Sequence, residues 1–382
     1  MKTDIWTIMS REVFYMWRDR GLRYILLLGP LLGILLFAGI YSSETIKHIP
    51  TAVVDLDDSQ SSLDLIKNFE NADNLSIISH PSSYKDLEEM IKEGRVVVGI
   101  VIPEDFGRNL NNLKGSRVLC IIDASNYIYA TNASNAVLGV TRTISAQAGI
   151  KTLIARGMEP GQAQNTYQGI EFVEQPWYNP TLNYAYFLVL GLALNIWQYC
   201  CMLTASMLVI GETGVKSWLQ VKASGFSLSR LFVGKSLTHI LLLTILVLPI
   251  YFLVFVILKY PLACSFGQLF LLTFFFILAV HSIGTLVSSL VSNAVDATRI
   301  GMMVAVPSFM VTGYTWPLEA MPAWLGKAAW ILPHTWFFQA LNYLTFKGGG
   351  WSFVWPYLLV LLLMAVLFYG LTALVVRYKE GC

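Results

Sequence analysis

The stretch YILLLGPLLGILLFAGIY, residues 24–41, contains no charged residue and is long enough to cross the hydrocarbon core of a bilayer as one helix. It is long for a signal peptide and no small-residue cleavage site follows it, so a cleaved signal is the weaker alternative. Comparable apolar runs recur along the chain. They occupy residues 184–210, 231–258, 269–291 and 355–376, with a shorter, weakly marked run at 300–314. The sequence therefore predicts six transmembrane helices.

The composition of the 382 residues also indicates a membrane protein. Charged residues make up 13% and hydrophobic residues 55%. Soluble domains contain roughly 25% charged residues, so a purely soluble protein is excluded. The net charge of +2 does not indicate a nucleic-acid partner. The five cysteines form no CxxC pair or Cys/His cluster, so we expect no metal site and no cofactor bound by this chain.

The basic residues predict the orientation of the chain. Six spans place both termini on one side of the membrane. Twelve basic residues lie on that side, in residues 1–23 and in the joints after the second, fourth and sixth apolar runs. The joints on the other side contain three, Lys259, Lys327 and Lys347. Because basic loops stay in the cytoplasm, we expect a multi-pass protein of the plasma (inner) membrane with both termini cytoplasmic.

A less apolar region between the first two spans predicts an inserted α/β domain, residues 43–182. Seventeen of the 24 acidic residues and 11 basic ones lie between Glu44 and Glu174. Short strand-like runs at 51–55, 75–79, 96–103 and 117–123 alternate with helical patterns. The charge and topology place this domain outside the cytoplasm. Asp55, Asp57 and Asp58 follow the first strand, where helix capping is favoured over cation binding because no EF-hand spacing follows.

Two segments on the cytoplasmic side have distinct patterns. In residues 1–23, apolar residues at helical spacing (Ile5, Met9, Val13, Met16 and Trp17) predict an amphipathic helix in the membrane interface, or one packed on a partner protein. The loop at 211–229 separates the second and third spans. FVGKSL (232–237) lacks the earlier glycine of a phosphate-binding loop, so the chain has no predicted nucleotide site.

The outer segment at 316–346 is too apolar for a free loop and too interrupted for a span. Pro317, Pro322 and Pro333 are expected to break helices, which predicts short re-entrant helices in the outer leaflet. Placing the charge of Glu319 at that depth in the membrane costs free energy unless the carboxylate is paired or hydrated. In the second span, Asn195 and Gln198 either face a substrate path or form hydrogen bonds between helices.

Three motifs together resemble the permeases of type-2 ABC transporters. TGYTWPLEAMPAWL (312–325), followed by ILP, is similar to the outer-helix signature of that family. GETG (211–214) and the later GK (234–235) resemble its cytoplasmic loop, with Thr and Gly in reversed order. REVFYMWRDRGLRYILLLGP (11–30) resembles its interfacial elbow helix and RD pair. The resemblance extends over essentially the whole chain, and the large outer domain is similar to the drug or lipid exporter branch.

The resemblance implies a fold of six transmembrane α-helices with re-entrant outer helices and an extracytoplasmic α/β domain between spans 1 and 2. The regions would be an elbow helix (1–23), span 1 (24–42), the outer domain (43–182) and a five-span region (183–382). It also implies a permease subunit without its own ATPase site that exports an amphipathic drug or lipid by alternating access. Its partners would be a cytoplasmic ABC ATPase holding ATP and Mg, a second permease subunit, membrane lipids and a candidate periplasmic adaptor.

The same resemblance suggests site residues. Contact with the ATPase is expected at Arg11, Glu12, Glu212, Thr213 and Lys216. An outer re-entrant gate is expected at Pro317, Leu318, Glu319, Pro322, Trp324 and Pro333, and a candidate substrate path at Asn195 and Gln198. The alternative is a membrane-anchored receptor or scaffold whose outer domain binds a ligand or partner. An intramembrane enzyme is disfavoured because no Ser/His or Asp/His cluster lies near the membrane surface.

Overall fold

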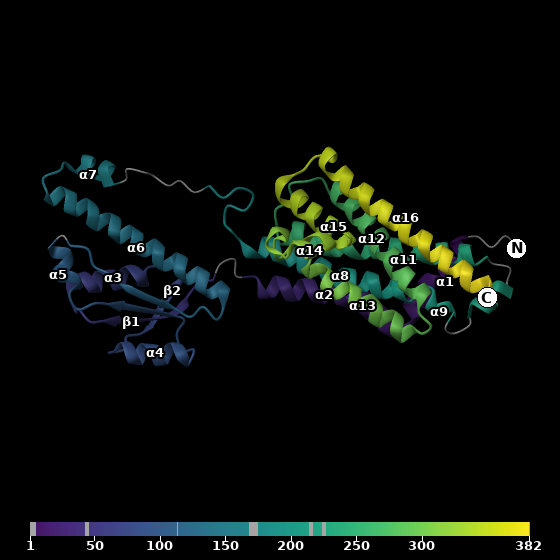
Figure 1. Ribbon diagram of the computed structural model, residues 1–382, viewed down its shortest axis with the longest axis horizontal. Helices are drawn as coiled ribbons and strands as arrows, with labels where there is room; N and C mark the ends of the chain where they lie inside the picture. The colour runs from purple at the N-terminus through teal and green to yellow at the C-terminus, as the bar shows by residue number, and fades with distance from the viewer. Residues whose placement is uncertain are drawn as a thin grey trace. The chain divides into compact units, whose positions relative to one another are not determined.

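The computed structural model describes residues 5–42, 46–112, 114–167, 175–213, 217–223 and 227–381. It divides into two compact units, each described here by itself. One unit is helical and comprises Met1–Glu44 and Pro176–Cys382. The other comprises Thr45–Gln175 and contains the sheet (Figure 1). Lys216, one of the predicted contact residues, lies outside the described residues.

Five helices of the helical unit are long and apolar enough to cross a membrane. They are α2 (Arg20–Ile40), α8 (Tyr184–Ser206), α11 with its π-helical extension (Leu228–Ile257), α12 (Phe266–Leu290) and the Trp351–Lys379 part of α16 (Trp351–Gly381). Apolar residues dominate the exposed faces of α2 and α16, whose most apolar windows are only 22% and 17% buried. The corresponding window of α8 is 72% buried. The chain is therefore a helical membrane protein in which α8 is the central helix.

The remaining helices of this unit are shorter. α13 has 17 residues and lies close to the weakly marked fifth apolar run, but it begins earlier and ends at Met310. This length is at the lower limit, about 17 residues, for a helix that spans a bilayer. The short elements are α1 (Ile5–Arg18), α9 (Ile210–Thr213), α10 (Ser217–Ala223), α13 (Ala294–Met310), a 3-10 turn at Leu318–Ala320, α14 (Ala323–Ala329), α15 (Pro333–Asn342) and a π-helical turn at Tyr343–Lys347.

Aromatic packing joins the helices of the core. The rings of Phe276 from α12 and Phe337 from α15 stack with centroids 4.0 Å apart. Trp197 of α8 is fully buried and donates its indole N–H to the carbonyl of Leu243 in α11, at 3.3 Å. Tyr314 donates its hydroxyl to the carbonyl of Phe187, at 2.6 Å. These contacts connect α8 with α11 and with the chain after α13.

The other unit is built on a four-stranded sheet in the order β2-β1-β3-β4. β1 (Ile49–Asp55) is parallel to β2 (Leu75–Ser79) and β3 (Val98–Ile102), and β3 is antiparallel to β4 (Leu119–Ile122). Helices pack on both faces, as the alternating pattern of the sequence predicts. The helices on the sheet are α3 (Gln60–Glu70), α4 (Tyr84–Lys92), α5 (Phe106–Asn111) and α6 (Tyr127–Ala155), whereas α7 (Pro160–Tyr167) packs on α6.

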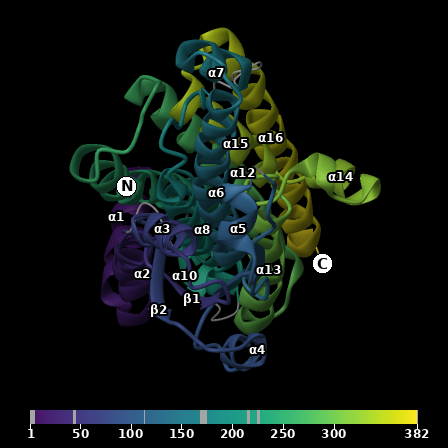
Figure 2. The ribbon, with the colours of Figure 1, turned by 90° about the vertical axis from the view of Figure 1, so that its left-hand side faces the viewer.

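Side chains of β1 point alternately to the two faces of the sheet, and this divides the apolar core of the unit in two. Ile49 and Val53 pack with residues of α3, α5 and α6 on one face. Ala52 and Val54 pack with α4 on the opposite face. Figure 2, an end-on view of this unit, shows α4 well separated from α3, α5 and α6. The sheet is thus covered by three helices on one side and by a single helix on the other.

The acidic turn after β1 is used in local hydrogen bonds. The Asp55 carboxylate accepts from the backbone N–H of Asp57 and from the hydroxyl of Ser62, at 3.0 and 2.6 Å. The Asp57 carboxylate accepts from the N–H of Gly107, at 2.8 Å. These bonds fix the turn against the first turns of α3 and α5, which is the capping role favoured by the sequence pattern.

Candidate functional site

The inward face of α1 differs from the apolar stripe predicted from the sequence. Ile8, Glu12 and Met16, spaced four residues apart, are its buried residues. Of the predicted apolar residues only Met16 is buried, whereas Trp17 is 60% exposed. The face that α1 packs inward is therefore a different one from the apolar stripe, and a carboxylate lies at its centre. The exposed face contains Trp6, Val13, Phe14, Tyr15 and Trp17, a composition suited to the membrane interface.

A glycine lets α1 approach α11 closely. A Cβ atom at Gly234 would lie 2.8 Å from Cγ2 of Ile8, closer than real side chains allow. The absence of a side chain at this position therefore permits the contact. The residue after this glycine is Lys235, and His239 follows one helical turn later. Residues four apart share a helix face, so both side chains can reach Glu12.

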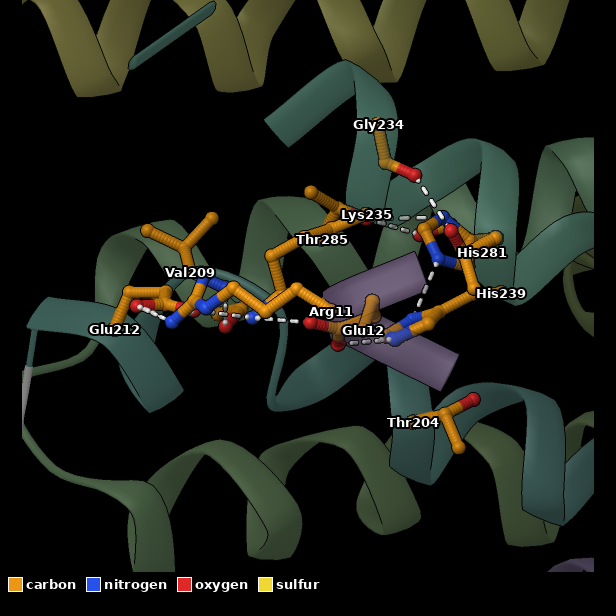
Figure 3. A network of polar contacts seen from close by, with 12 residues as sticks. Arg11, Glu12, Thr204, Val209, Glu212, Gly234, Lys235, His239, His281 and Thr285 are labelled. Atoms are coloured by element: carbon orange, nitrogen blue, oxygen red, sulfur yellow. Dashed lines mark hydrogen bonds and ion pairs between the residues drawn. The ribbon is translucent and has the colours of Figure 1, made fainter. Parts of the chain in front are cut away.

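A largely buried ion cluster, called here the ion cluster, is formed by Arg11 and Glu12 of α1, Glu212 of α9, and Lys235 and His239 of α11 (Figure 3). Lys235 Nζ donates to Glu212 Oε1 at 3.0 Å and lies 3.4 Å from Glu12 Oε2. His239 Nε2 lies 2.9 Å from Glu12 Oε1, and Arg11 Nη2 lies 3.1 Å from Glu212 Oε1. The cluster therefore connects α1, α9 and the first half of α11.

The ion cluster is balanced in charge and, apart from the 39% exposed side chain of Arg11, almost closed to water. The side chains of Glu12, Glu212 and Lys235 are each at most 7% exposed. The two carboxylates are matched by the cationic side chains of Lys235 and Arg11. Burial of charges costs several kcal/mol per ion unless each is paired and hydrogen bonded. Ser217 at the start of α10 meets that need by donating to Glu212 Oε2 at 2.5 Å.

The partners of the two carboxylates outweigh the effect of burial on their acidity. Burial alone raises the pKa of Glu212, but Lys235, Ser217 and Arg11 lower the pKa to about 2. Burial likewise raises the pKa of Glu12, whereas the hydrogen bond with His239 and the charge of Lys235 hold the pKa below its usual value. Both carboxylates are therefore ionised at neutral pH, and the cluster contributes most when both carry their charge.

A hydrogen-bond chain extends from the ion cluster into the helix bundle. With the Nε2–H of His239 donated to Glu12, its Nδ1 accepts from His281 Nε2 at 3.3 Å. The free His281 Nδ1 then accepts from the hydroxyl of Tyr369, at 2.8 Å. The hydroxyl of Thr285 donates instead to the backbone carbonyl of His281, at 2.7 Å. Tyr369 is therefore the donor to His281 Nδ1. The chain joins α1, α11, α12 and α16.

Sequence reasoning identified three members of the ion cluster and missed two. Lys235 and His239 were not selected, although their spacing of four residues and the glycine before Lys235 are visible in the sequence. Thr213 is exposed and donates to the carbonyl of Val209, at 3.2 Å. Glu12 and Glu212 are buried within the chain, so their carboxylates do not lie on an open surface.

The two polar residues of the second span bond to each other within α8, and Gln198 also bonds to two other helices. Gln198 donates to Asn195 at 3.1 Å and to the carbonyl of Ala305 in α13 at 3.2 Å, and it accepts from His334 Nε2 at 2.9 Å. Asn195 also donates to Tyr199 at 2.9 Å. Within the described residues, the buried Nδ1 of His334 has no hydrogen-bond partner. Gln198 thus forms interhelical hydrogen bonds, whereas both bonds of Asn195 lie within α8, and the substrate path stays a prediction.

The prolines of the outer segment lie where helices begin. Pro317 and Pro322 precede the 3-10 turn and α14, and Pro333 is the first residue of α15. Glu319 is exposed, so its charge carries no burial cost within this chain. Leu318 is half-buried and Trp324 is 72% exposed. The outer segment thus presents aromatic side chains around a short broken helix, while Pro333 is buried at its base.

Comparison with known proteins identifies the family. A model of the ABC-2 family transporter protein matches residues 20–374. The chain belongs to the ABC-2 transporter family. It is similar to the probable multidrug ABC transporter permease YbhR of Escherichia coli (strain K12), with 25% identity over 93% of this chain and 94% of the relative. The inner membrane transport permease YhhJ of Escherichia coli (strain K12) is 23% identical over 90% of each chain.

More distant similarity reaches a eukaryote. ABC transporter G family member 20 of Dictyostelium discoideum is 24% identical over 57% of this chain, a stretch that covers 30% of that protein. The family match extends from the start of α2 to the last turns of α16 and includes most of the ion cluster. Arg11 and Glu12 precede the matched region.

Proposed function

We propose that this chain is the permease subunit of an ABC exporter, driven by a separate cytoplasmic ATPase that holds ATP and Mg. The family membership and the name of YbhR, a probable multidrug permease, support export of an amphipathic drug or lipid by alternating access. Two such chains would pair, as homodimer or close paralogues, and each would bind one ATPase. A periplasmic adaptor remains a further candidate partner.

In this proposal α13 is the sixth membrane helix and both termini are cytoplasmic. The α/β unit would then be extracytoplasmic, and α14 and α15 would be the re-entrant outer gate. Support comes from the basic residues that concentrate on the side of the termini. Labelling with a membrane-impermeant maleimide tests this arrangement in a chain whose own five cysteines are replaced by serine. Lys85→Cys should be labelled in intact cells and Tyr378→Cys only after lysis, and the opposite pattern would reverse the topology.

The observation that carries the proposed mechanism is the buried ion cluster. Glu212, at the start of the loop at 211–229, is held by Arg11 of the interfacial helix and by Lys235 of α11. A displacement of α9 and α10 by the ATPase would therefore pull on α1 and α11 together. Glu12 and Glu212 act here as positioning residues inside the permease, while exposed residues such as Thr213 are candidates for the contact itself.

Deletion of residues 212–225 provides the direct test of this docking role. We expect the deletion to abolish co-purification with the ATPase, whereas the chain still reaches the membrane. Retained binding would contradict the assignment of the loop. A chain that purifies only with an outer-face partner would favour the receptor or scaffold function instead.

A further inference from the structure

The α/β unit contains a groove that none of the transport features above uses. Its volume is about 840 Å³, and its walls come from α3, from α5 with the segment after it, and from α6. Small-molecule pockets typically have about 300–1,000 Å³. The volume of the groove lies within this range.

The length of α6 creates this groove. Its first half packs on the sheet through Ala133 and Val137, which are buried. Its second half has no fully buried residue, and one face of it, including Ile144, Ala148 and Lys151, lines the groove. Figure 1 shows α6 and α3 on the same side of the sheet, with α7 following the end of α6.

The floor and the rim of the groove differ in character. Leu65 and Phe106, both nearly buried, and the half-buried Leu110, Val118 and Ile144 supply apolar surface. Serine, threonine, asparagine and glutamine side chains make up much of the remaining lining. A ligand that fits such a lining has both an apolar part and a polar part.

The charged residues of the rim indicate which charge the polar group of the ligand carries. Lys67, Lys114 and Lys151 line the groove and are exposed. Across the part of the chain that the structure describes, none of the three takes part in an ion pair. Asp64 is the one acidic residue of the lining, and it accepts a hydrogen bond from Gln60 at 3.0 Å. The groove is therefore locally basic, although acidic residues outnumber basic ones in the segment as a whole.

We propose that this groove binds a small, single-tailed anionic amphiphile, with the apolar tail on the floor and the anionic group between the lysines. Unpaired lysines at a rim attract an anion and disfavour a cation of the same shape. This site is independent of the ion cluster in the helical unit and of the ATPase. It would give the α/β unit a role in ligand binding of its own.

Hydrogen–deuterium exchange of the full chain in dodecyl maltoside tests this site. The probes are dodecanoate, dodecyltrimethylammonium and dodecanol, which share one tail length and differ in charge. We expect dodecanoate to slow exchange in α3 and in residues 141–152 of α6, whereas the cation and the alcohol leave both segments unchanged. The helical unit serves as an internal reference for nonspecific effects of the amphiphile on the micelle.

Two variants complete the test. Replacing Lys67 and Lys151 together by glutamine should weaken dodecanoate protection by about tenfold, since two exposed charges no longer attract the anionic group. The matched control is Lys85→Gln, an exposed lysine of α4 on the opposite face of the sheet. Equal protection by all three probes, or equal weakening by the control, would overturn the proposal. Protection that depends on protein concentration without probe would instead assign the groove to a second copy of this chain and likewise overturn it.

Discussion

Replacement of Lys235 by methionine is the most informative perturbation of the ion cluster. Methionine keeps most of the length of the side chain but removes the charge that lies 3.0 Å from Glu212 and 3.4 Å from Glu12. Both carboxylates stay buried; Glu212 keeps its ion pair with Arg11, and Glu12 keeps only its hydrogen bond with His239. Removal of one partner from a buried ion pair costs about 3–5 kcal/mol. Because both carboxylates retain a partner, we expect the lower end, about 3 kcal/mol.

Thermal unfolding in detergent measures this loss. For domains of 150–250 residues, about 2–4 °C of Tm corresponds to 1 kcal/mol, so the expected decrease is roughly 6–12 °C. Lys327→Met is the matched control, because Lys327 lies exposed on α14 and forms no ion pair with a described residue. The double variant Lys235→Met with Glu12→Gln restores the charge balance and should recover part of the loss.

Functional coupling provides a second readout of the same variant. If the ion cluster transmits movement between α9, α1 and α11, Lys235→Met should lower substrate-stimulated ATPase activity of the assembled complex more than basal activity. The reasoning is refuted if Tm falls by less than about 2 °C, as for an exposed pair. It is equally refuted if the control variant loses as much stability as Lys235→Met.

Three further predictions concern contacts of the helical unit. Gly234→Val should displace α1, because even a Cβ atom at this position would lie 2.8 Å from Ile8. We expect less ATPase to co-purify with this variant, and the addition of Ile8→Ala should restore part of the binding. Unchanged ATPase binding would argue against a role for this contact. Gln198→Leu leaves His334 Nε2 without its acceptor and should cost about 1–3 kcal/mol, visible as a lower Tm than in wild type. The pKa of Glu212 is about 2 against an ordinary value of 4.5. The ionised carboxylate therefore stabilises the folded chain fully above pH 4.5, and this contribution declines as the pH falls towards 2. When Tm is measured as a function of pH, Glu212→Gln should show a smaller decrease in acid than the wild type.

The membrane helices and the α/β unit could be predicted because their signals are local. Apolar length identified α2, α8, α11, α12 and α16, and alternation of strands and helices indicated the sheet. α13 was weakly marked for a physical reason, since it has 17 residues and includes Asp296 and Arg299 in its first turns.

The ion cluster could be predicted only in part, because its pairs join distant segments. Glu12 and His239 are 227 residues apart, and Arg11 and Glu212 are 201 apart. Periodicity reports which residues share a face of one helix, but not which helix that face meets. The apolar neighbours of Glu12 therefore suggested an apolar stripe, whereas the structure places the carboxylate inward against Lys235.

Purification from native membranes in a mild detergent, followed by an ATPase assay, tests the central claim most directly. We predict that the chain carries a stoichiometric cytoplasmic ATPase and that amphipathic drugs or lipids stimulate its hydrolysis of ATP. Purification of the chain without an ATPase, or with only an outer-face partner, would contradict the account.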